Sequence, residues 1–167
     1  PVYAGVDYKK ILERAENEAD IIIWDGGNND FSFYKPDLNI VVVDPLRAGH
    51  EVKYYPGMIN FLMADVLVIN KIDHAQKRGI KLIEQNIAKY NPRAAVIKAK
   101  SKITFNYKGN LHGKRVIVVE DGPTVTHGGM KYGAGTIVAK EHKCKIIDAS
   151  HYAVGSIKET YKKFKHL

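Results

Sequence analysis

The stretch Val66-Leu67-Val68-Ile69-Asn70-Lys71-Ile72-Asp73 decides the expected fold of this 167-residue chain. Its first half is entirely apolar, and its second half turns polar at once. A short, uninterrupted apolar run is typical of a strand covered on both faces, as happens in parallel sheets flanked by helices. The stretch therefore predicts a buried strand that carries a polar motif at its carboxyl end.

Other parts of the chain repeat this strand pattern and alternate it with helical patterns. The further predicted strands are Asp20–Trp24, Asn39–Val43, Ala94–Ala99, Arg115–Val119 and Lys145–Ile147. Apolar residues at helical spacing predict helices within Tyr8–Ala15, Ile80–Tyr90, Met130–Val138 and Val154–Phe164. Asp7 is placed to cap the first helix, and Asn91-Pro92 ends the second. This alternation predicts an α/β fold with a doubly wound, mostly parallel sheet between layers of helices.

Composition favours a soluble, cytoplasmic protein with no membrane partner. Hydrophobic residues make up 45% of the chain and charged residues 26%. Its apolar runs are all much shorter than the roughly 20 residues of a membrane span. The first residues lack the basic region and long apolar stretch of a signal peptide. The single cysteine, Cys144, excludes an intrachain disulfide framework.

The net charge of +8 leaves three explanations open. They are a nucleic-acid partner, a lysine-rich solvated surface, and a site for a small polyanion such as a nucleotide or sugar phosphate. The basic residues are spread along the chain without the interleaved aromatic residues of an RNA-binding motif. This distribution favours the second and third explanations.

Two polar stretches interrupt the strand–helix alternation. Pro45–Gly57 is an expected irregular loop of the length that often carries function. Asn106–Gly113 is polar with two glycines. It either separates two lobes, residues 1–105 and 113–167, or forms a simple hairpin-like loop. Residues 113–167 are expected either as their own α/β lobe or as part of the same sheet as residues 1–105.

The motif after the opening strand has the asparagine-lysine-any-aspartate pattern with which GTP-binding proteins read the base. In that interpretation Asp73 accepts two hydrogen bonds from guanine, the stem of Lys71 stacks along the ring, and Asn70 completes the motif. Ser101, after the following strand, stands where such proteins place a second base-contacting loop. The alternatives are that Asp73 caps the next helix and that Ser101 lies in a solvated basic loop.

Two other strand ends carry candidate catalytic groups. Asp25 follows an apolar strand and precedes two glycines, the arrangement in which a carboxylate holds Mg²⁺, although a simple Asp-Gly turn has the same sequence. Asp44, Arg47, His50 and Glu51 combine carboxylates, a guanidinium and an imidazole in one stretch. That set suits phosphoryl transfer, and loops also carry such residues for solubility alone.

The fifth predicted strand leads into a glycine-rich segment. Its candidate phosphate- or substrate-binding residues are Asp121, Thr124, Thr126, His127, Gly128 and Gly129. Backbone amides in the turn through Gly133-Ala134-Gly135 would bind an anion at the start of a helix. The alternative is a capped helix whose glycines permit close packing.

One expected element is missing from the sequence. The phosphate-binding loop Gly-x4-Gly-Lys-Ser/Thr does not occur, and the stretch from Gly109 to Lys114 is one residue short and lacks the hydroxyl. Strong triphosphate binding and efficient hydrolysis are therefore not expected of these residues alone.

Several strings together resemble a known family. They are Trp24–Phe31, Pro36–Pro45, Gly49–Glu51, Ala64–Asp73, Val119–Thr124, Thr126–Met130 and Tyr152–Ile157. The chain resembles archaeal cyclic 2,3-diphosphoglycerate synthetases along nearly its whole length. That resemblance implies a much longer ligase-type enzyme with a P-loop domain, which couples ATP hydrolysis with Mg²⁺ to closing a phosphoanhydride ring in 2,3-bisphosphoglycerate.

By this resemblance, residues 1–105 are the later part of a P-loop NTPase-like domain of the SIMIBI type, in a three-layer sandwich without its P-loop. Asp25 would be the Walker-B carboxylate, and the nucleotide would be ATP or GTP. Three hypotheses follow: a synthetase portion that works with a P-loop-bearing N-terminal polypeptide, a stand-alone GTP- or GDP-binding regulatory protein, and a basic nucleic-acid-associated module. An open sheet edge would also permit a homo-oligomer.

Overall fold

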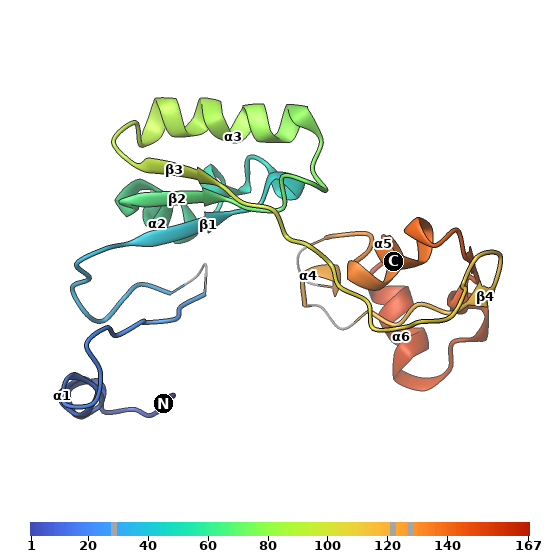
Figure 1. The fold of residues 1–167 in the computed structure, drawn as a ribbon, viewed down its shortest axis with the longest axis horizontal. Helices are drawn as coiled ribbons and strands as arrows, with labels where there is room; N and C mark the ends of the chain where they lie inside the picture. The colour runs from blue at the N-terminus through green and yellow to red at the C-terminus, as the bar shows by residue number, and fades with distance from the viewer. Residues whose placement is uncertain (28–29, 121–122, 127–128) are drawn as a thin grey trace. The chain divides into compact units, whose positions relative to one another are not determined.

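The computed structural model describes residues 1–27, 30–120, 123–126 and 129–167. The chain divides into two compact units, Pro1–Lys102 and Ile103–Leu167, which are described separately (Figure 1). Among the described residues, no helix is both long enough and apolar enough to cross a membrane.

Unit 1 is built on a three-stranded parallel sheet. Its strands are β1 (Ile40–Val43), β2 (Val66–Ile69) and β3 (Ala95–Lys98), in the spatial order β1-β2-β3. The register aligns Val43 with Ile69 and Ile69 with Lys98, so the three carboxyl ends are level. The predicted α/β class with a parallel sheet is confirmed, and the opening stretch forms its central strand.

Two helices pack on the same face of this sheet: α2 (Gly57–Met63) and α3 (Lys77–Tyr90). The buried core joins them to the strands through Val43, Phe61, Ala64, Leu67, Ile69, Ile83 and Ile87. Each helix links two neighbouring parallel strands, and the right-handed sense of such connections places both helices on the same face. The predicted helix Ile80–Tyr90 is confirmed, whereas α2 was not predicted.

Asn91 ends α3 as predicted, and its buried side chain has a structural role. The Asn91 Nδ2 atom donates to the carbonyl oxygens of Phe61 and Ala64, at 2.9 Å each. Because these carbonyls lie at the end of α2, one amide fixes the ends of the two helices to each other.

The amino-terminal part of unit 1 corrects one prediction. Helix α1 (Tyr8–Glu16) forms as expected, with the Asp7 side chain accepting a hydrogen bond from the Lys10 amide. The predicted strand Asp20–Trp24 is wrong: no strand forms there, and Ile21 and Ile23 are 80% and 86% exposed. An apolar run becomes a buried strand only where a neighbouring strand and a covering layer receive it, and the described residues of unit 1 do not supply them here.

The polar stretch after β1 is more regular than predicted. It contains two short 3₁₀ helices, η1 (Pro45–Arg47) and η2 (His50–Val52). The Asp44 side chain caps η1 by accepting a hydrogen bond from the Leu46 amide at 3.0 Å.

Unit 2 contains a separate pair of parallel strands, β4 (Arg115–Val116) and β5 (Lys145–Ile146). Its other elements are α4 (Pro123–Thr126), α5 (Ala134–Glu141), η3 (Ala149–Tyr152) and α6 (Gly155–Lys163). Both predicted strands exist but are shorter than expected. Ile117 and Val119, predicted to continue β4, are exposed because no element in the described part of unit 2 covers them.

Candidate functional site

The candidate site lies where β1, β2 and β3 end. Asn70 donates from its amide to the carbonyl of Val43 at 3.1 Å, and Ala99 donates to that of Ile69 at 2.9 Å. These bonds continue the sheet past its last paired residues. The polar residues that follow the three strands therefore meet at one edge, as the predicted topology required.

The Asn70–Asp73 motif forms a tight turn fixed to the end of β3. Lys71 has a φ of 54°, a left-handed conformation that is uncommon for residues other than glycine. The Asn70 Oδ1 atom accepts from the Lys71 amide at 2.8 Å, and the Ile72 amide donates to the Ala99 carbonyl at 3.2 Å. Such conformations persist only where surrounding bonds enforce them, and they are frequent at functional sites.

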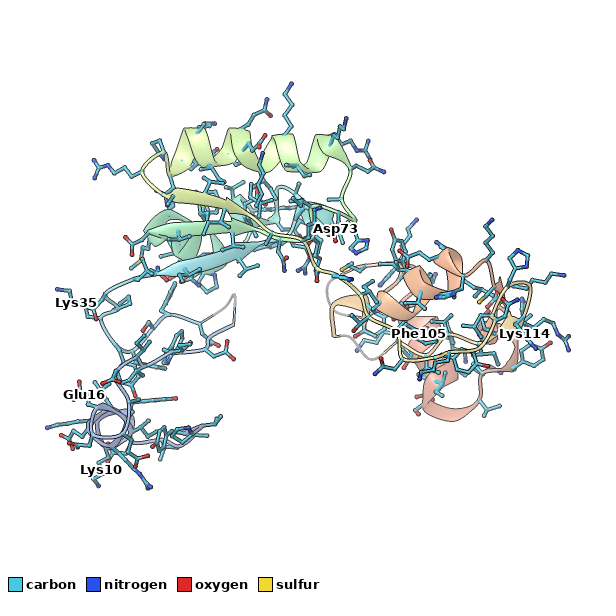
Figure 2. The ribbon with its side chains drawn as sticks, in the orientation of Figure 1. Lys10, Glu16, Lys35, Asp73, Phe105 and Lys114 are labelled. Atoms are coloured by element: carbon cyan, nitrogen blue, oxygen red, sulfur yellow. The ribbon has the colours of Figure 1, made fainter. Side chains whose placement is uncertain are left out.

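Asp73 and Ser101 are brought together by this turn. The Ser101 amide donates to Asp73 Oδ1 at 3.2 Å, and His74 Nε2 lies 3.2 Å from the Ser101 carbonyl oxygen and 3.7 Å from Asp73 Oδ2. Figure 2 shows Asp73 at the end of unit 1 where the strands finish. The expected proximity of the two strand-end loops is therefore present in the structure.

The electrostatics of Asp73 keep it ionised. Burial raises its pKa, but hydrogen bonds from the Ser101 and Asp73 amides and the charges of His74 and Lys100 together hold the pKa below its usual value. The cap of α3 is Gln76, so the alternative in which Asp73 caps that helix does not hold. Asp73 is thus a hydrogen-bond acceptor outside the helix.

Asp44 is the centre of a small charged cluster. Its Oδ2 atom lies 2.9 Å from Lys71 Nζ and 3.5 Å from Arg47 Nη2, while Oδ1 caps η1. The Arg47 Nε atom is buried and has no hydrogen-bond partner among the described residues. Because both Asp44 oxygens are engaged, this carboxylate positions Lys71 and Arg47; a catalytic role for any of them stays a prediction.

His50 and Glu51 are held by other contacts. Glu51 accepts from the Gly49 amide at 2.8 Å and from Asn86 Nδ2 of α3 at 2.7 Å. His50 packs its ring edge-on against Tyr54, with centroids 5.0 Å apart. The bond from Asn86 connects η2 to α3. Catalytic roles for His50 and Glu51 also stay predictions.

Gly79 is a structural determinant that the sequence analysis missed. A Cβ atom at this position in the first turn of α3 would lie 2.4 Å from the Pro45 carbonyl oxygen. Only glycine permits this close approach, which sets η1 against the start of α3. The available signal was a glycine immediately before the predicted helix Ile80–Tyr90, a position where glycine permits close packing.

Asp25 does not follow a strand, because Asp20–Trp24 forms none. Its magnesium-binding role stays a prediction. Within the described ranges, no three His, Cys, Asp or Glu side chains gather as a metal-binding group.

The predicted phosphate segment in unit 2 is only partly described. Asp121, His127 and Gly128 lie outside the described residues, as does the side chain of Thr124. Thr126 belongs to α4, and Gly129 has a φ of 67°. The roles proposed for these residues remain predictions.

The start of α5 corrects the predicted anion site. The Glu120 carboxylate accepts hydrogen bonds from the amides of Gly133, Gly135 and Thr136 at 2.9, 3.3 and 2.9 Å, and from the Thr136 hydroxyl at 2.7 Å. Burial raises the Glu120 pKa, but these four bonds lower it below the usual value. The amides assigned to a phosphate are therefore occupied by the chain's own carboxylate.

Fold and site together define an α/β protein with a polar cluster at the carboxyl edge of a small parallel sheet. No known family model matches the chain, and no solved structure does. Among curated proteins it is 62% identical over 167 residues to arginine synthetase ArcE of Thermococcus kodakarensis. It is 30% identical over 116 residues to the cyclic 2,3-diphosphoglycerate synthetase of Thermococcus sibiricus.

The match to the arginine synthetase covers 99% of this chain and 37% of that protein, and the second match covers 68% and 25%. The chain thus spans little more than a third of the length of the arginine synthetase. The predicted resemblance is confirmed in part: the chain is related to a cyclic 2,3-diphosphoglycerate synthetase, but the stronger of these two similarities is to an arginine synthetase.

Proposed function

We propose that this chain is the nucleotide-binding portion of a synthetase, and that the carboxyl edge of the β1–β3 sheet binds the nucleotide base. The observation that carries the proposal is the Asp73–Ser101 hydrogen bond, which joins the two predicted base-contacting loops. Both curated relatives are named as synthetases, which agrees with this assignment.

Base recognition follows from the chemistry of Asp73. An ionised carboxylate accepts hydrogen bonds, and guanine presents two adjacent N–H donors whereas adenine does not offer that pair. The left-handed backbone conformation of Lys71 and the ion pair between its Nζ atom and Asp44 fix the side chain of this lysine. Its aliphatic stem supplies an apolar surface for the base. The site therefore suits GTP better than ATP, and either nucleotide is compatible with a synthetase.

Mg²⁺ fits this chain only as a companion of the nucleotide. Because Mg²⁺ is commonly held by one or two carboxylates plus substrate phosphates, Asp25 would serve as its single protein ligand. Asp44 is unsuited, since its two oxygens are already engaged by Lys71, Arg47 and the Leu46 amide. The phosphate cradle would come from a P-loop-bearing N-terminal polypeptide, which would complete a P-loop NTPase-like sandwich.

For the whole enzyme we propose an arginine-forming synthetase like the Thermococcus kodakarensis protein, because that similarity covers nearly the whole chain. A cyclic 2,3-diphosphoglycerate synthetase, acting on 2,3-bisphosphoglycerate, is the second candidate. The weaker match to the Thermococcus sibiricus protein supports it.

The test is calorimetric titration of the folded chain with GTP, GDP, ATP and 2,3-bisphosphoglycerate, each with Mg²⁺. Guanine nucleotides should bind, and Asp73→Asn should weaken that binding by more than about tenfold because it removes a charged acceptor. Asp37→Asn is the matched control, since it removes an exposed carboxylate ahead of β1. No heat with any nucleotide, or equal binding by both variants, would contradict the base-binding proposal.

A further inference from the structure

Among the described residues, helices cover only one face of the β1–β3 sheet, and the other is called the bare face here. Helices α2 and α3 pack on the face that carries Val43, Leu67 and Ile69. The opposite face carries Ile40, Val42 and Ile97, which are 55%, 62% and 52% exposed, together with half-buried Val66 and Val68. The register aligns Val42, Val68 and Ile97 across the three strands, so these apolar side chains form one surface.

A parallel sheet with a bare apolar face is unusual for a complete fold. Parallel strands are found almost only where helices cover both faces. The two connections in unit 1 both advance from β1 toward β3, and their right-handed sense places α2 and α3 on the same side. Within the described residues β1 is an edge strand, and strand–helix units continuing in the opposite direction from that edge would place helices on the other side.

A second element of unit 1 lacks cover as well. The run Ile21-Ile22-Ile23 has the composition of a strand, yet forms none and lies largely exposed. Unit 1 therefore exposes both an apolar sheet face and a strand-forming segment.

We propose that the bare face, defined by Ile40, Val42, Val66, Val68 and Ile97, docks a helical layer from the part of the synthetase that has no counterpart in these 167 residues. The relevant length exists in the relative, because almost two thirds of the Thermococcus kodakarensis protein lies outside the match. The inference rests on the proposed synthetase assignment, but not on which nucleotide or substrate is bound.

The test places a charge on this face in two contexts. Val42→Lys is made in the chain alone, and in a chimera in which the chain replaces the matching residues of the Thermococcus kodakarensis synthetase. Val6→Lys is the control, because Val6 is 96% exposed and lies ahead of α1. Both substitutions are also made at the matching positions of the Thermococcus kodakarensis synthetase. The result then does not depend on whether the chimera folds well.

Thermal unfolding provides the readout. Val42→Lys should shift the midpoint of the chain alone by less than about 2 °C, and lower that of the chimera and the relative by more than about 5 °C, since it buries an unpaired charge there. Val6→Lys should have little effect in any context.

Three results would overturn the docking proposal. They are equal small shifts in all contexts, a dimer of the chain alone that Val42→Lys dissociates, and a monomeric chain that Val42→Lys destabilises strongly. The second result would assign the face to another copy, and the third to a contact within the chain. Nucleotide titration of the same proteins reports separately on the proposed function, because it measures base binding directly and does not depend on the unfolding midpoint.

Discussion

The close approach of α3 to η1 predicts an unusual response to Gly79→Ala. In an open helix interior this substitution stabilises a protein, by up to about 1 kcal/mol. Here the added methyl would lie 2.4 Å from the Pro45 carbonyl oxygen and 3.7 Å from the Ala48 Cβ. Ordinary contact needs about 3.5 Å, so the helix and η1 must separate by about 1 Å.

The Pro45 carbonyl oxygen cannot move aside as the end of a flexible side chain would. The obstructing atom is backbone, and η1 is fixed by the Asp44 cap and by the Arg47 amide bonding to the Asp44 carbonyl at 2.9 Å. Overpacking of this kind costs about 1–3 kcal/mol. Because the obstructing atom is backbone, we take the upper part of this range, about 2–3 kcal/mol. Subtracting a helix-propensity gain of about 1 kcal/mol leaves a net loss of about 1–2 kcal/mol, or about 2–8 °C in the unfolding midpoint.

Urea unfolding followed by circular dichroism measures this loss. Gln85→Ala on the exposed side of α3 is the control and should change the free energy of unfolding by less than about 0.5 kcal/mol. A Gly79→Ala protein that is as stable as the parent, or more so, would refute the close approach and the placement of η1 against α3.

Two further predictions concern other hydrogen-bonded side chains. Asn91→Ala should cost about 2–4 kcal/mol in urea unfolding, because it leaves the carbonyls of Phe61 and Ala64 without their donor; a loss below about 1 kcal/mol would contradict the buried bonds. Because the Glu120 pKa is lowered in the folded state, its contribution to stability is present above the ordinary glutamate pKa and is lost as pH falls through the lowered value. Glu120→Gln should therefore flatten the loss of thermal stability between about pH 6 and about pH 3, and an unchanged acid profile would contradict the Glu120 contacts.

The sheet of unit 1 could be predicted because its strands carry strong local signals. The runs around Val42, Leu67 and Val96 are short, β-branched and bounded by polar residues, and each lies in β1, β2 or β3. The same signal misled at Asp20–Trp24, where composition favours a strand but no covering layer is available. Helix α2 escaped prediction because seven residues are too few to show a clear helical period.

The sequence predicts where the candidate site lies, because the strand ends meet there. It does not predict which side chains contact one another. Parallel topology brings Asp73 near Ser101 whatever their side chains do, so order along the chain sufficed. The pairing of Lys71 with Asp44, 27 residues apart, depends on the left-handed turn at Lys71 and on the η1 cap. Likewise, Glu120 reaches the amides of α5 only through tertiary folding, and glycine spacing alone cannot distinguish an internal carboxylate from a bound phosphate.

Under the proposed function, the charges at the sheet edge favour base recognition over phosphate binding. Asp44 neutralises Lys71 and Arg47, which leaves those cations less available to a triphosphate, while Asp73 is bonded mainly to backbone amides and keeps its negative charge for N–H donors. In unit 2, the amides best suited to a phosphate are held by Glu120. The described residues are therefore better equipped to recognise a base than to stabilise transferring phosphate. Under the proposed function, base recognition resides in this chain, and the groups for phosphate chemistry would come from the proposed P-loop-bearing polypeptide.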